Sequence, residues 1–254
     1  MRIVFWNCAM ALHRKWVALT ALTPDIAVIG ECATPEILTR RGVTGLDDRC
    51  QWMGRNPNKG LGVFAFNGYR LRRHAPFRPT LQHVLPVEVT GPERCNLLAV
   101  WAMNASGGVT RKHQLGPLRR GLAAYRDFLA AGPSVVGGDL NSNAIWDKPG
   151  WRINHMTLVE KLSGLGLASA YHLETGEAHG AERVPTCYWR DRRKDGPTYH
   201  LDYAFVPPAA LRSLAVGSFE EWVGTGLSDH VPLVVDLAPA AACALAPARD
   251  TTRR

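Results

Sequence analysis

The sequence predicts a single α/β domain that combines several helices with at least two sets of strands. Short apolar runs typical of strands alternate with stretches of helical periodicity over most of the 254 residues. A hydrophobic fraction of 46% and an aromatic fraction of 8% are typical of a chain that folds around a core. No linker or fixed-period repeat divides the chain. We therefore expect one domain over residues 1–238 and a disordered Ala/Pro/Arg-rich tail over residues 239–254.

The expected elements follow from the spacing of apolar residues. Apolar side chains recur at helical intervals within residues 11–22, 112–131 and 156–165. Short apolar runs predict strands at residues 3–6, 25–29, 61–66, 85–89, 96–101, 134–138, 167–171, 187–189, 199–206, 214–222 and 231–237.

Charge and cysteine content limit the function classes. Thirty Lys and Arg against 22 Asp and Glu give a net charge of +8, which suits a polyanionic partner such as nucleic acid. The six cysteines are scattered without a C-x-x-C pair, so neither a zinc site nor a disulfide framework is predicted. The chain has no membrane-spanning apolar run and begins as a strand, so we expect a soluble cytoplasmic protein without an obligate protein partner.

Polar residues stand at or near the ends of five predicted strands and within a sixth. Any one of them has an ordinary explanation, because Asn and Asp are common turn residues. The recurrence is harder to explain in that way, since α/β proteins place ligands where strand ends converge. The residues concerned are Asn7, Glu31, Asn104, Asp139 with Asn141, Asp202, and Asp229 with His230.

Five segments of the chain surround these polar residues. They are Phe5-Trp-Asn7, Asp25-Ile-Ala-Val-Ile-Gly-Glu31, Gly138-Asp-Leu-Asn141, His200-Leu-Asp-Tyr-Ala-Phe205 and Leu227-Ser-Asp-His230. Taken in order, they resemble the endonuclease/exonuclease/phosphatase superfamily, the group of deoxyribonuclease I and the apurinic/apyrimidinic endonucleases. The likeness runs from residue 4 to about residue 237. It implies a four-layer α/β sandwich in which two central β-sheets pack together and helices flank them. It also implies metal-dependent hydrolysis of phosphate esters, with Mg²⁺ as the usual cation and Mn²⁺ as an alternative.

The resemblance implies a metal site at three of these strand ends. Glu31 is the expected direct ligand, because Mg²⁺ binds few carboxylates and keeps several waters. Asn7 and Asp229 match the positions that flank and assist the ion. Taken alone, each of the three would more often be a surface or turn residue.

The resemblance also implies five catalytic residues. Asp139 would orient or deprotonate the attacking water, and Asn141 would hold a phosphoryl oxygen. His230, when protonated, would stabilise the developing negative charge, and Asp202 would keep it oriented and charged. Asn104 is expected to touch phosphate.

Other interpretations of the polar residues stay open. Asp202 could instead pair with a nearby arginine such as Arg183 or Arg190. The remaining histidines are expected to face solvent or to be satisfied locally, and His200 has no predicted role. They are His13, His74, His83, His113, His155, His172 and His179.

The sequence departs from the superfamily pattern at three positions near the site. Trp101 occupies a strand where many members have a His or Tyr, so the group that protonates the leaving oxygen is not identified. Ala9 stands where some nucleases have a second carboxylate, and Gly30 replaces a common Gln.

Basic clusters and tryptophans suggest a nucleic-acid substrate. Arg and Lys can neutralise phosphates and aromatic rings can stack on bases, although such clusters are as often solvated faces and such rings as often core. The preferred hypothesis is a nuclease acting on DNA or RNA. The alternatives are an enzyme acting on a small or lipid phosphate ester, and an inactive nucleic-acid-binding module. The expected substrate-binding residues are Arg111, Arg190 and Trp189.

Overall fold

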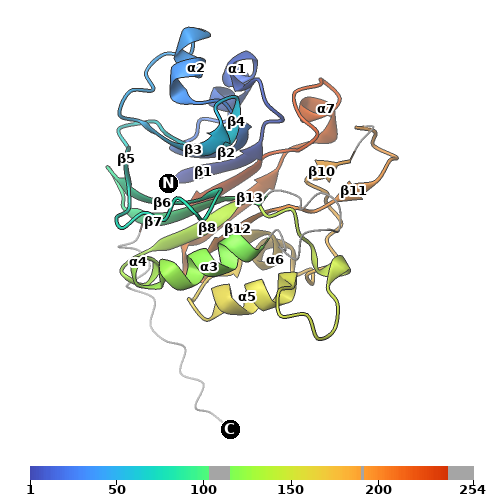
Figure 1. Cartoon of the computed structure of the whole chain (residues 1–254). Coiled ribbons are helices and arrows are strands. Elements are labelled where there is room, and N and C mark those ends of the chain that lie inside the picture. The colour runs from blue at the N-terminus through green and yellow to red at the C-terminus, as the bar shows by residue number, and fades with distance from the viewer. Residues whose placement is uncertain (103–114, 190–191, 240–254) are drawn as a thin grey trace.

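The computed structural model describes residues 1–102, 115–189 and 192–239. Two six-stranded sheets pack face to face, and helices cover the outer face of each (Figure 1). This arrangement confirms the expected four-layer α/β sandwich. No helix in the described part of the chain is long and apolar enough to cross a bilayer.

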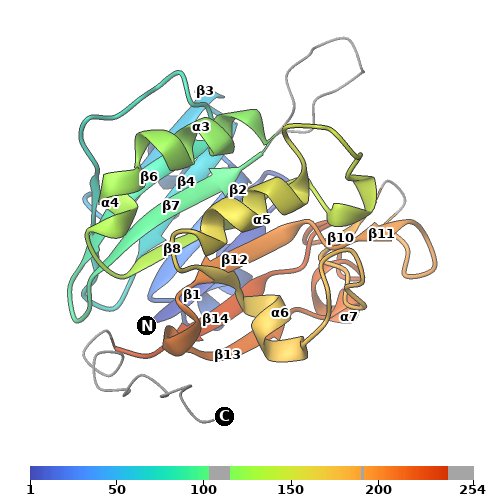
Figure 2. The same cartoon turned by 90° about the horizontal axis from the view of Figure 1, so that it is seen from below.

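One sheet has the strand order β5-β6-β7-β8-β12-β9, in which only β7 and β8 run parallel. Helices α3, α4, α5 and α6 lie on its outer side (Figure 2). Its strands are β5 (Arg70–Arg73), β6 (Val84–Thr90), β7 (Cys95–Trp101), β8 (Ser134–Asp139), β9 (Ala168–Ser169) and β12 (Asp202–Val206). Its helices are α3 (Gly116–Ala124), α4 (Arg126–Ala130), α5 (His155–Ser163) and α6 (Ala170–Thr175).

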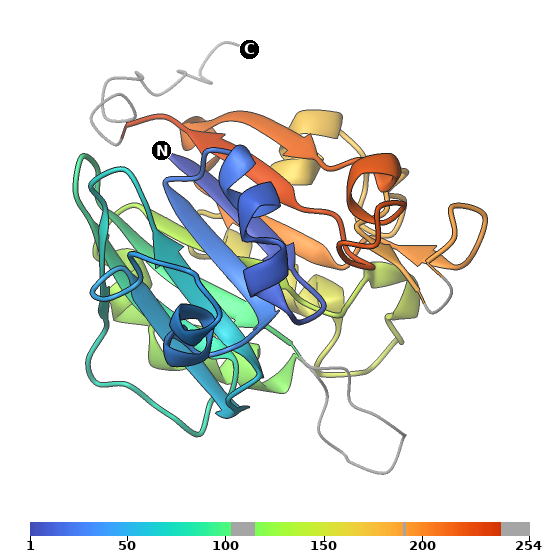
Figure 3. The same ribbon diagram turned by 90° about the horizontal axis from the view of Figure 1, so that it is seen from above.

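The other sheet has the order β13-β14-β1-β2-β4-β3, in which only β1 and β2 run parallel. Helices α1, α2 and α7 cover its outer face (Figure 3). Its strands are β1 (Arg2–Asn7), β2 (Ile26–Cys32), β3 (Cys50–Asn56), β4 (Lys59–Ala65), β13 (Leu211–Val216) and β14 (Leu233–Leu237). Its helices are α1 (Trp16–Ala21), α2 (Pro35–Arg40) and α7 (Phe219–Trp222).

Alternation along the strands divides the buried side chains between layers. In β1, Ile3 and Phe5 point into the core between the sheets, whereas Val4 and Trp6 point toward the outer helices. A strand buried on both faces reads as a continuous apolar run, which is why residues 3–6 predicted a strand without alternation.

Short elements complete the described chain. Strands β10 (Cys187–Tyr188) and β11 (Thr198–Tyr199) form a separate two-stranded hairpin. Three short 3-10 helices are η1 (Leu12–Arg14), η2 (Ala144–Trp146) and η3 (Pro208–Ala210).

Several element boundaries differ from the expectations. The helix expected over residues 112–131 is broken at Tyr125 into α3 and α4. The strand expected at 167–171 is a two-residue strand followed by α6, and the strand expected at 214–222 ends at Val216, before α7. Strands β3 and β5 and helix α2 lie in stretches expected to be loops or left unassigned. The expected tail lies outside the described residues, apart from Pro239.

Candidate active site

The candidate site forms where the parallel strands of the two sheets end. Asn7 is the last residue of β1 and pairs in register with Gly30 of β2. In the facing sheet, Asp139 ends β8 and lies opposite Trp101 of β7 and Asp202 of β12. The side-chain amide of Asn7 donates to Asp139 Oδ2 at 3.0 Å, so the strand ends of the two sheets meet directly.

Asp139 is buried and has three hydrogen-bond donors. Its Oδ1 accepts from the backbone N–H of Asn141 at 2.8 Å, and its Oδ2 accepts from the amides of Asn7 and Asn141. Burial, strengthened by the neighbouring Asp202 charge, raises the pKa of Asp139 to about 7, although His230 acts in the opposite direction. The carboxyl group is therefore poised to accept or release a proton near neutral pH.

Asn141 adopts a left-handed backbone conformation, with φ of 47°. Its side-chain amide donates to the carbonyl of Ala102 at 2.7 Å and to Asp139 Oδ2 at 3.2 Å. These bonds connect the turn after β8 to the end of β7. The amide that was expected to contact phosphate is engaged within the protein in this structure.

Glu31 also has a left-handed backbone, with φ of 59°, at an irregularity in the pairing of β2 with β4. Such a bulge re-aims a side chain at the end of a strand. Oε1 lies 3.4 Å from the Asn7 amide, and Oε2 forms an ion pair with Lys59 Nζ at 3.0 Å. Lys59 also lies 5.6 Å from the centre of the Trp101 ring.

Asp202 and His230 form a buried pair, with Asp202 Oδ2 2.8 Å from His230 Nδ1. Burial alone would lower the pKa of His230, but Asp202, with a smaller contribution from Cys187, outweighs burial and raises it well above the ordinary value. The imidazole is therefore held in its charged form. The expected contact between these residues is present, and Arg183 pairs instead with Glu177, at 3.2 Å.

Asp229 lies on the open side of the site. The hydroxyl of the preceding Ser228 donates to the carbonyl of Asn7 at 2.7 Å, which fixes this segment against the end of β1. The Asp229 carboxylate is half-buried and lies 3.9 Å from the guanidinium of Arg192. Lys15, which donates to the carbonyl of Cys8, lies close enough for its charge to interact with Asp229.

The donors at this strand edge fit a hard divalent cation. Glu31 and Asp229 provide half-buried carboxylates, and Asn7 Oδ1 accepts one hydrogen bond, from Ala9 N–H, which leaves a second lone pair. The ammonium of Lys59 already lies against Glu31, as expected of a carboxylate that attracts cations. Asp139, Asp202 and His230 also lie within 4.8 Å of one another, but a protonated imidazole cannot serve as a metal ligand.

Of the eleven sequence-predicted residues, the structure brings seven together, places Trp189 apart from them, and does not describe the other three. Trp189 is half-buried and follows Tyr188, whose N–H donates to the Asp229 carbonyl. Asn104, Arg111 and Arg190 lie outside the described residues. The residues brought together are Asn7, Glu31, Asp139, Asn141, Asp202, Asp229 and His230.

Three cations near the site were missed by sequence reasoning. Lys59 belongs to a stretch that predicted only a loop before an apolar strand, and Lys15 to a predicted helix. Arg192 is not among the substrate-binding residues that the sequence predicts. No local pattern identifies them, because each reaches the site through the folded arrangement of distant segments.

Two glycines explain how bulky groups fit at the strand ends. Gly138 has φ of +133°, and a Cβ there would lie 1.9 Å from the Val100 carbonyl oxygen, so β8 approaches β7 too closely for any side chain. A Cβ at Gly30 would touch the Trp101 ring at 3.4 Å. Gly30 and Trp101, two of the positions at which the sequence departs from the superfamily pattern, are therefore neighbours in space.

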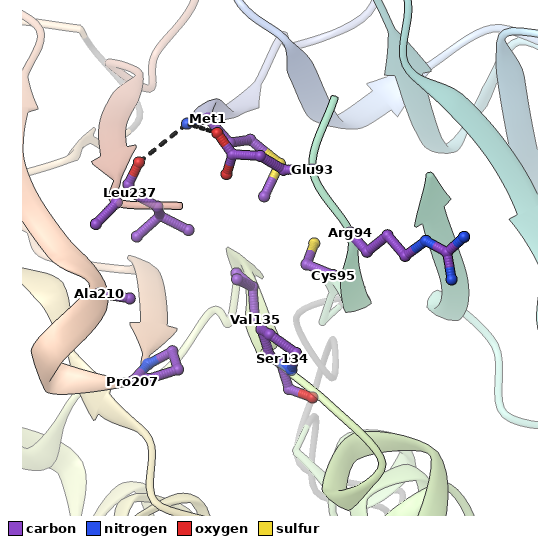
Figure 4. A pocket seen from close by; sticks show the side chains of 11 residues that line it. Met1, Glu93, Arg94, Cys95, Ser134, Val135, Pro207, Ala210 and Leu237 are labelled. Atoms are coloured by element: carbon purple, nitrogen blue, oxygen red, sulfur yellow. Dashed lines mark hydrogen bonds and ion pairs between the residues drawn. The ribbon is translucent and has the colours of Figure 1, made fainter. Parts of the chain in front are cut away.

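A separate apolar pocket of about 190 Å³ lies at the opposite end of the strands (Figure 4). Its lining includes Met1 before β1, Cys95 and Ser134 at the beginnings of β7 and β8, and Leu237 at the end of β14. The Met1 amino group donates to the Leu237 carbonyl at 2.9 Å and pairs with Glu93 at 3.2 Å. This pocket is therefore distinct from the candidate active site.

Comparison with known proteins identifies the fold. No protein-family model and no curated protein sequence matches the chain. Among solved structures, a 3′–5′ exonuclease from Neisseria meningitidis has a TM-score of 0.62 at 19% identity, over 93% of this chain and 99% of that one. An AP endonuclease from Archaeoglobus fulgidus has a TM-score of 0.67 at 16% identity, over 93% and 99%. An endonuclease/exonuclease/phosphatase from Beutenbergia cavernae has a TM-score of 0.62 at 19% identity, over 94% and 72%. The chain therefore has the fold of the endonuclease/exonuclease/phosphatase superfamily.

Proposed function

We propose that this protein is a divalent-metal-dependent phosphodiesterase that hydrolyses nucleic acid. The observation that carries the proposal is the convergence of Glu31, Asn7 and Asp139 with the buried Asp202–His230 pair at one edge of this fold. A module that only bound nucleic acid would need neither a carboxylate of raised pKa nor a buried charged imidazole. The solved neighbours include a 3′–5′ exonuclease and AP endonucleases, which supports the same class of reaction.

In this proposal Asp139 acts on the attacking water. Its pKa of about 7 lets the carboxylate accept a proton near neutrality, and the Asn7 amide, 3.0 Å away, fixes its orientation. Glu31, with Asn7 and Asp229, would hold Mg²⁺ or Mn²⁺, which when bound neutralises charge on the phosphoryl oxygens. Lys59 neutralises Glu31 when the metal is absent.

His230 stabilises the negative charge that develops on the phosphoryl oxygens. Asp202 is fully buried and binds His230 through Nδ1, which keeps the ring oriented and protonated. A fixed positive charge in a site shielded from water costs no reorganisation when the reaction occurs. Asn141 holds the turn after Asp139. Its side-chain amide is proposed to donate to a phosphoryl oxygen of the substrate in place of Asp139 Oδ2.

An exposed apolar loop supports a nucleic-acid substrate. The segment after Asn141 leads to Ile145, Trp146 and Trp151, which are 54%, 44% and 50% exposed. Trp146 packs against Tyr199 of β11 with ring centres 5.0 Å apart, which places this loop beside the β10–β11 hairpin (Figure 2). Rings presented in this way can stack on unpaired bases or wedge into a groove.

A basic pocket of about 240 Å³ provides a second supporting feature. It is lined by Trp52, Arg55, Arg73 and His83 among others. His83 packs against Trp101, with ring centres 4.5 Å apart, and Trp101 in turn neighbours Lys59. We propose that a flanking phosphate binds in this pocket.

Other basic residues are neutralised locally. Arg70 pairs with Asp48 and Arg72 with Glu88, both on exposed surface. Lys194 pairs with Glu220 in the same way. The solvated-face interpretation therefore applies to these residues, and Arg55 and Arg73, which line the basic pocket, are the better candidates for contact with a polyanion.

The cytoplasmic location belongs to the same proposal. Five cysteines are free and buried among the described residues, which suits a reducing compartment. They are Cys8, Cys32, Cys50, Cys95 and Cys187.

The proposal is tested by digestion of plasmid DNA, an abasic duplex, single-stranded DNA and RNA, beside a panel of phosphomonoesters. We expect cleavage of at least one nucleic acid with Mg²⁺ and none with EDTA. Glu31→Gln and His230→Ala should abolish most of the activity, whereas Asp48→Asn, at an exposed carboxylate, should leave it unchanged. Cleavage that survives EDTA or both active-site substitutions would refute the mechanism. Turnover of monoesters alone would identify a small phosphate ester as the substrate instead.

A further inference from the structure

Four histidines and a glutamate gather on the outer side of the β12 sheet, away from the candidate active site. His155 begins α5, His172 belongs to α6, and His179 and Glu182 follow α6 (Figure 2). His200 comes two residues before β12 begins. We call these five residues the histidine cluster. They are buried or half-buried, so exposure to solvent, one of the two alternatives expected for His155, His172 and His179, does not apply to these three.

Three members of the histidine cluster have the separation of metal ligands. One donor atom each from His172, His179 and Glu182 lies within 4.8 Å of the other two. His172 Nε2 and Glu182 Oε1 are 3.2 Å apart. Donor atoms around a tetrahedral zinc ion lie about 3.3 Å from one another, as follows from metal–donor distances of about 2.0–2.1 Å. The side chains must therefore move to surround an ion, and the stacked rings of His172 and His179 must separate.

Glu182 is held in place by hydrogen bonds from the protein. Oε2 accepts from the Asn143 amide at 3.0 Å and from the N–H of Gly180 at 2.9 Å. Oε1 accepts from the Tyr203 hydroxyl at 3.2 Å. Carboxylates that bind metals are oriented by such outer partners.

Unpaired ring nitrogens provide an independent observation. Two buried ring nitrogens of this cluster, His155 Nδ1 and His200 Nε2, lack a hydrogen-bond partner among the described residues. His200 is 3% exposed, and its Nδ1 lies 2.8 Å from the Val184 carbonyl. A carbonyl only accepts, so Nδ1 carries the proton and Nε2 presents a buried lone pair.

We propose that His172, His179 and Glu182 bind a structural zinc ion, and that His200, which lies outside the group of donor atoms within 4.8 Å, moves in to provide Nε2 as the fourth ligand. Imidazole and carboxylate donors are the usual ligands of Zn²⁺ outside cysteine sites. The arrangement of His200, with one ring nitrogen on a backbone carbonyl and the other available, is that of most zinc-bound histidines. Without an ion, the buried Nε2 of His200 has no hydrogen-bond partner among the described residues.

The zinc ion would stabilise two segments that lead to active-site residues. Glu182 is bonded to Asn143, two residues after Asn141, and His200 lies two residues before Asp202. An ion shared by these segments would fix both against α6. The sequence did not predict this site, because its ligands are spread over residues 172–200 without a clustered Cys/His motif.

Zinc binding is tested on full-length protein stripped with a chelator and dialysed into metal-free buffer. Isothermal titration with ZnCl₂ and elemental analysis should give one zinc ion per chain in the wild type and in Glu31→Gln, which removes the proposed Mg²⁺ ligand. Zinc should also raise the melting temperature of both. The double variant H172N/H179N should lose the bound ion and the thermal shift, whereas H13N/H74N, the matched control outside the cluster, should keep them.

If circular dichroism shows that H172N/H179N does not fold, a second variant provides the test. Glu182→Gln preserves the hydrogen-bonding shape and should weaken zinc binding strongly. Cobalt provides a direct readout, because Co²⁺ bound tetrahedrally should give an intense visible absorption in the wild type and none in Glu182→Gln. Equal zinc uptake by the wild type and the cluster variants, or no uptake by the wild type, would overturn the proposal.

Discussion

Asp202 and His230 form a fully buried ion pair, 2.8 Å from oxygen to nitrogen, that joins the two sheets of the sandwich. Asp202 begins β12, whereas His230 lies in the segment before β14. The second oxygen, Asp202 Oδ1, has no hydrogen-bond partner among the described residues. A buried carboxylate with one oxygen unpaired is costly, so His230 is the partner that makes its charge tolerable.

Replacing Asp202 by Asn removes the negative charge of this pair but keeps the size and shape of the side chain. The carbonyl oxygen of the introduced amide can still accept from His230 Nδ1, but without the carboxylate the pKa of His230 should fall from its raised value. We expect the turnover rate to drop about 10²–10⁴-fold, the usual contribution of a positioned acid–base group. Steady-state kinetics and NMR titration of the His230 ring measure the two effects. A normal rate with a lowered His230 pKa would show that the charge is not used in catalysis.

Replacing Lys59 by Met should tighten binding of the divalent cation. Lys59 and the metal compete for the Glu31 carboxylate, and the ion pair at 3.0 Å must break before the ion binds. A partly exposed pair contributes about 0.2–1 kcal/mol, so we expect the Kd for Mn²⁺ to decrease about 1.4- to fivefold. Titration followed by electron paramagnetic resonance measures free Mn²⁺ directly. Lys194→Met, at an exposed pair with Glu220, is the control and should leave the Kd unchanged.

Sequence reasoning could predict the strand-end residues but not the cations beside them. Asn7 and Asp139 each follow a continuous apolar run, so their place at a strand end follows from local pattern. Lys59 comes beside Glu31 only because β2 and β4 pair, with Cys32 opposite Gly60. Pairing between segments separated by a loop depends on packing of the whole sheet, which local pattern does not encode.

Alanine at Gly138 should destabilise the protein far more than alanine at Gly132. A Cβ at Gly138 would lie 1.9 Å from the Val100 carbonyl oxygen, at a backbone φ of +133° that only glycine adopts readily, and backbone atoms cannot move aside cheaply. We expect a loss of at least about 3 kcal/mol in the free energy of unfolding. At Gly132 the nearest atom is the Asn96 side-chain nitrogen at 3.8 Å. Urea denaturation of both variants tests the difference, and similar midpoints would contradict the close approach of β8 to β7.

Replacing Trp146 by Ala should weaken binding of single-stranded nucleic acid without changing the fold. Trp146 is 44% exposed on the loop that follows the site. Stacking of a base on an aromatic side chain contributes about 1–3 kcal/mol, so the Kd should rise about five- to 150-fold. Fluorescence anisotropy with a labelled oligonucleotide in EDTA measures binding without cleavage. Val17→Ala, at an 80% exposed apolar residue on α1, is the control, and an unchanged Kd for Trp146→Ala would exclude stacking on this ring.

Replacing His83 by Asn should reduce the loss of stability on acidification. Burial, with the nearby charge of Arg55, lowers the pKa of His83 to about 4, whereas in the unfolded chain it is about 6.5. Between these values the unfolded chain binds the extra proton, so stability rises with pH and is lost as the pH falls from about 6.5 toward 4. Asn tolerates the left-handed backbone at this position, where φ is 59°, and does not titrate. Urea denaturation at pH 7.5 and pH 4.5 should therefore give a smaller decrease in the free energy of unfolding for His83→Asn than for the wild type. Because other buried histidines contribute in the same direction, the difference between the two proteins carries the test, and an equal decrease in both would show that His83 is not the group that titrates.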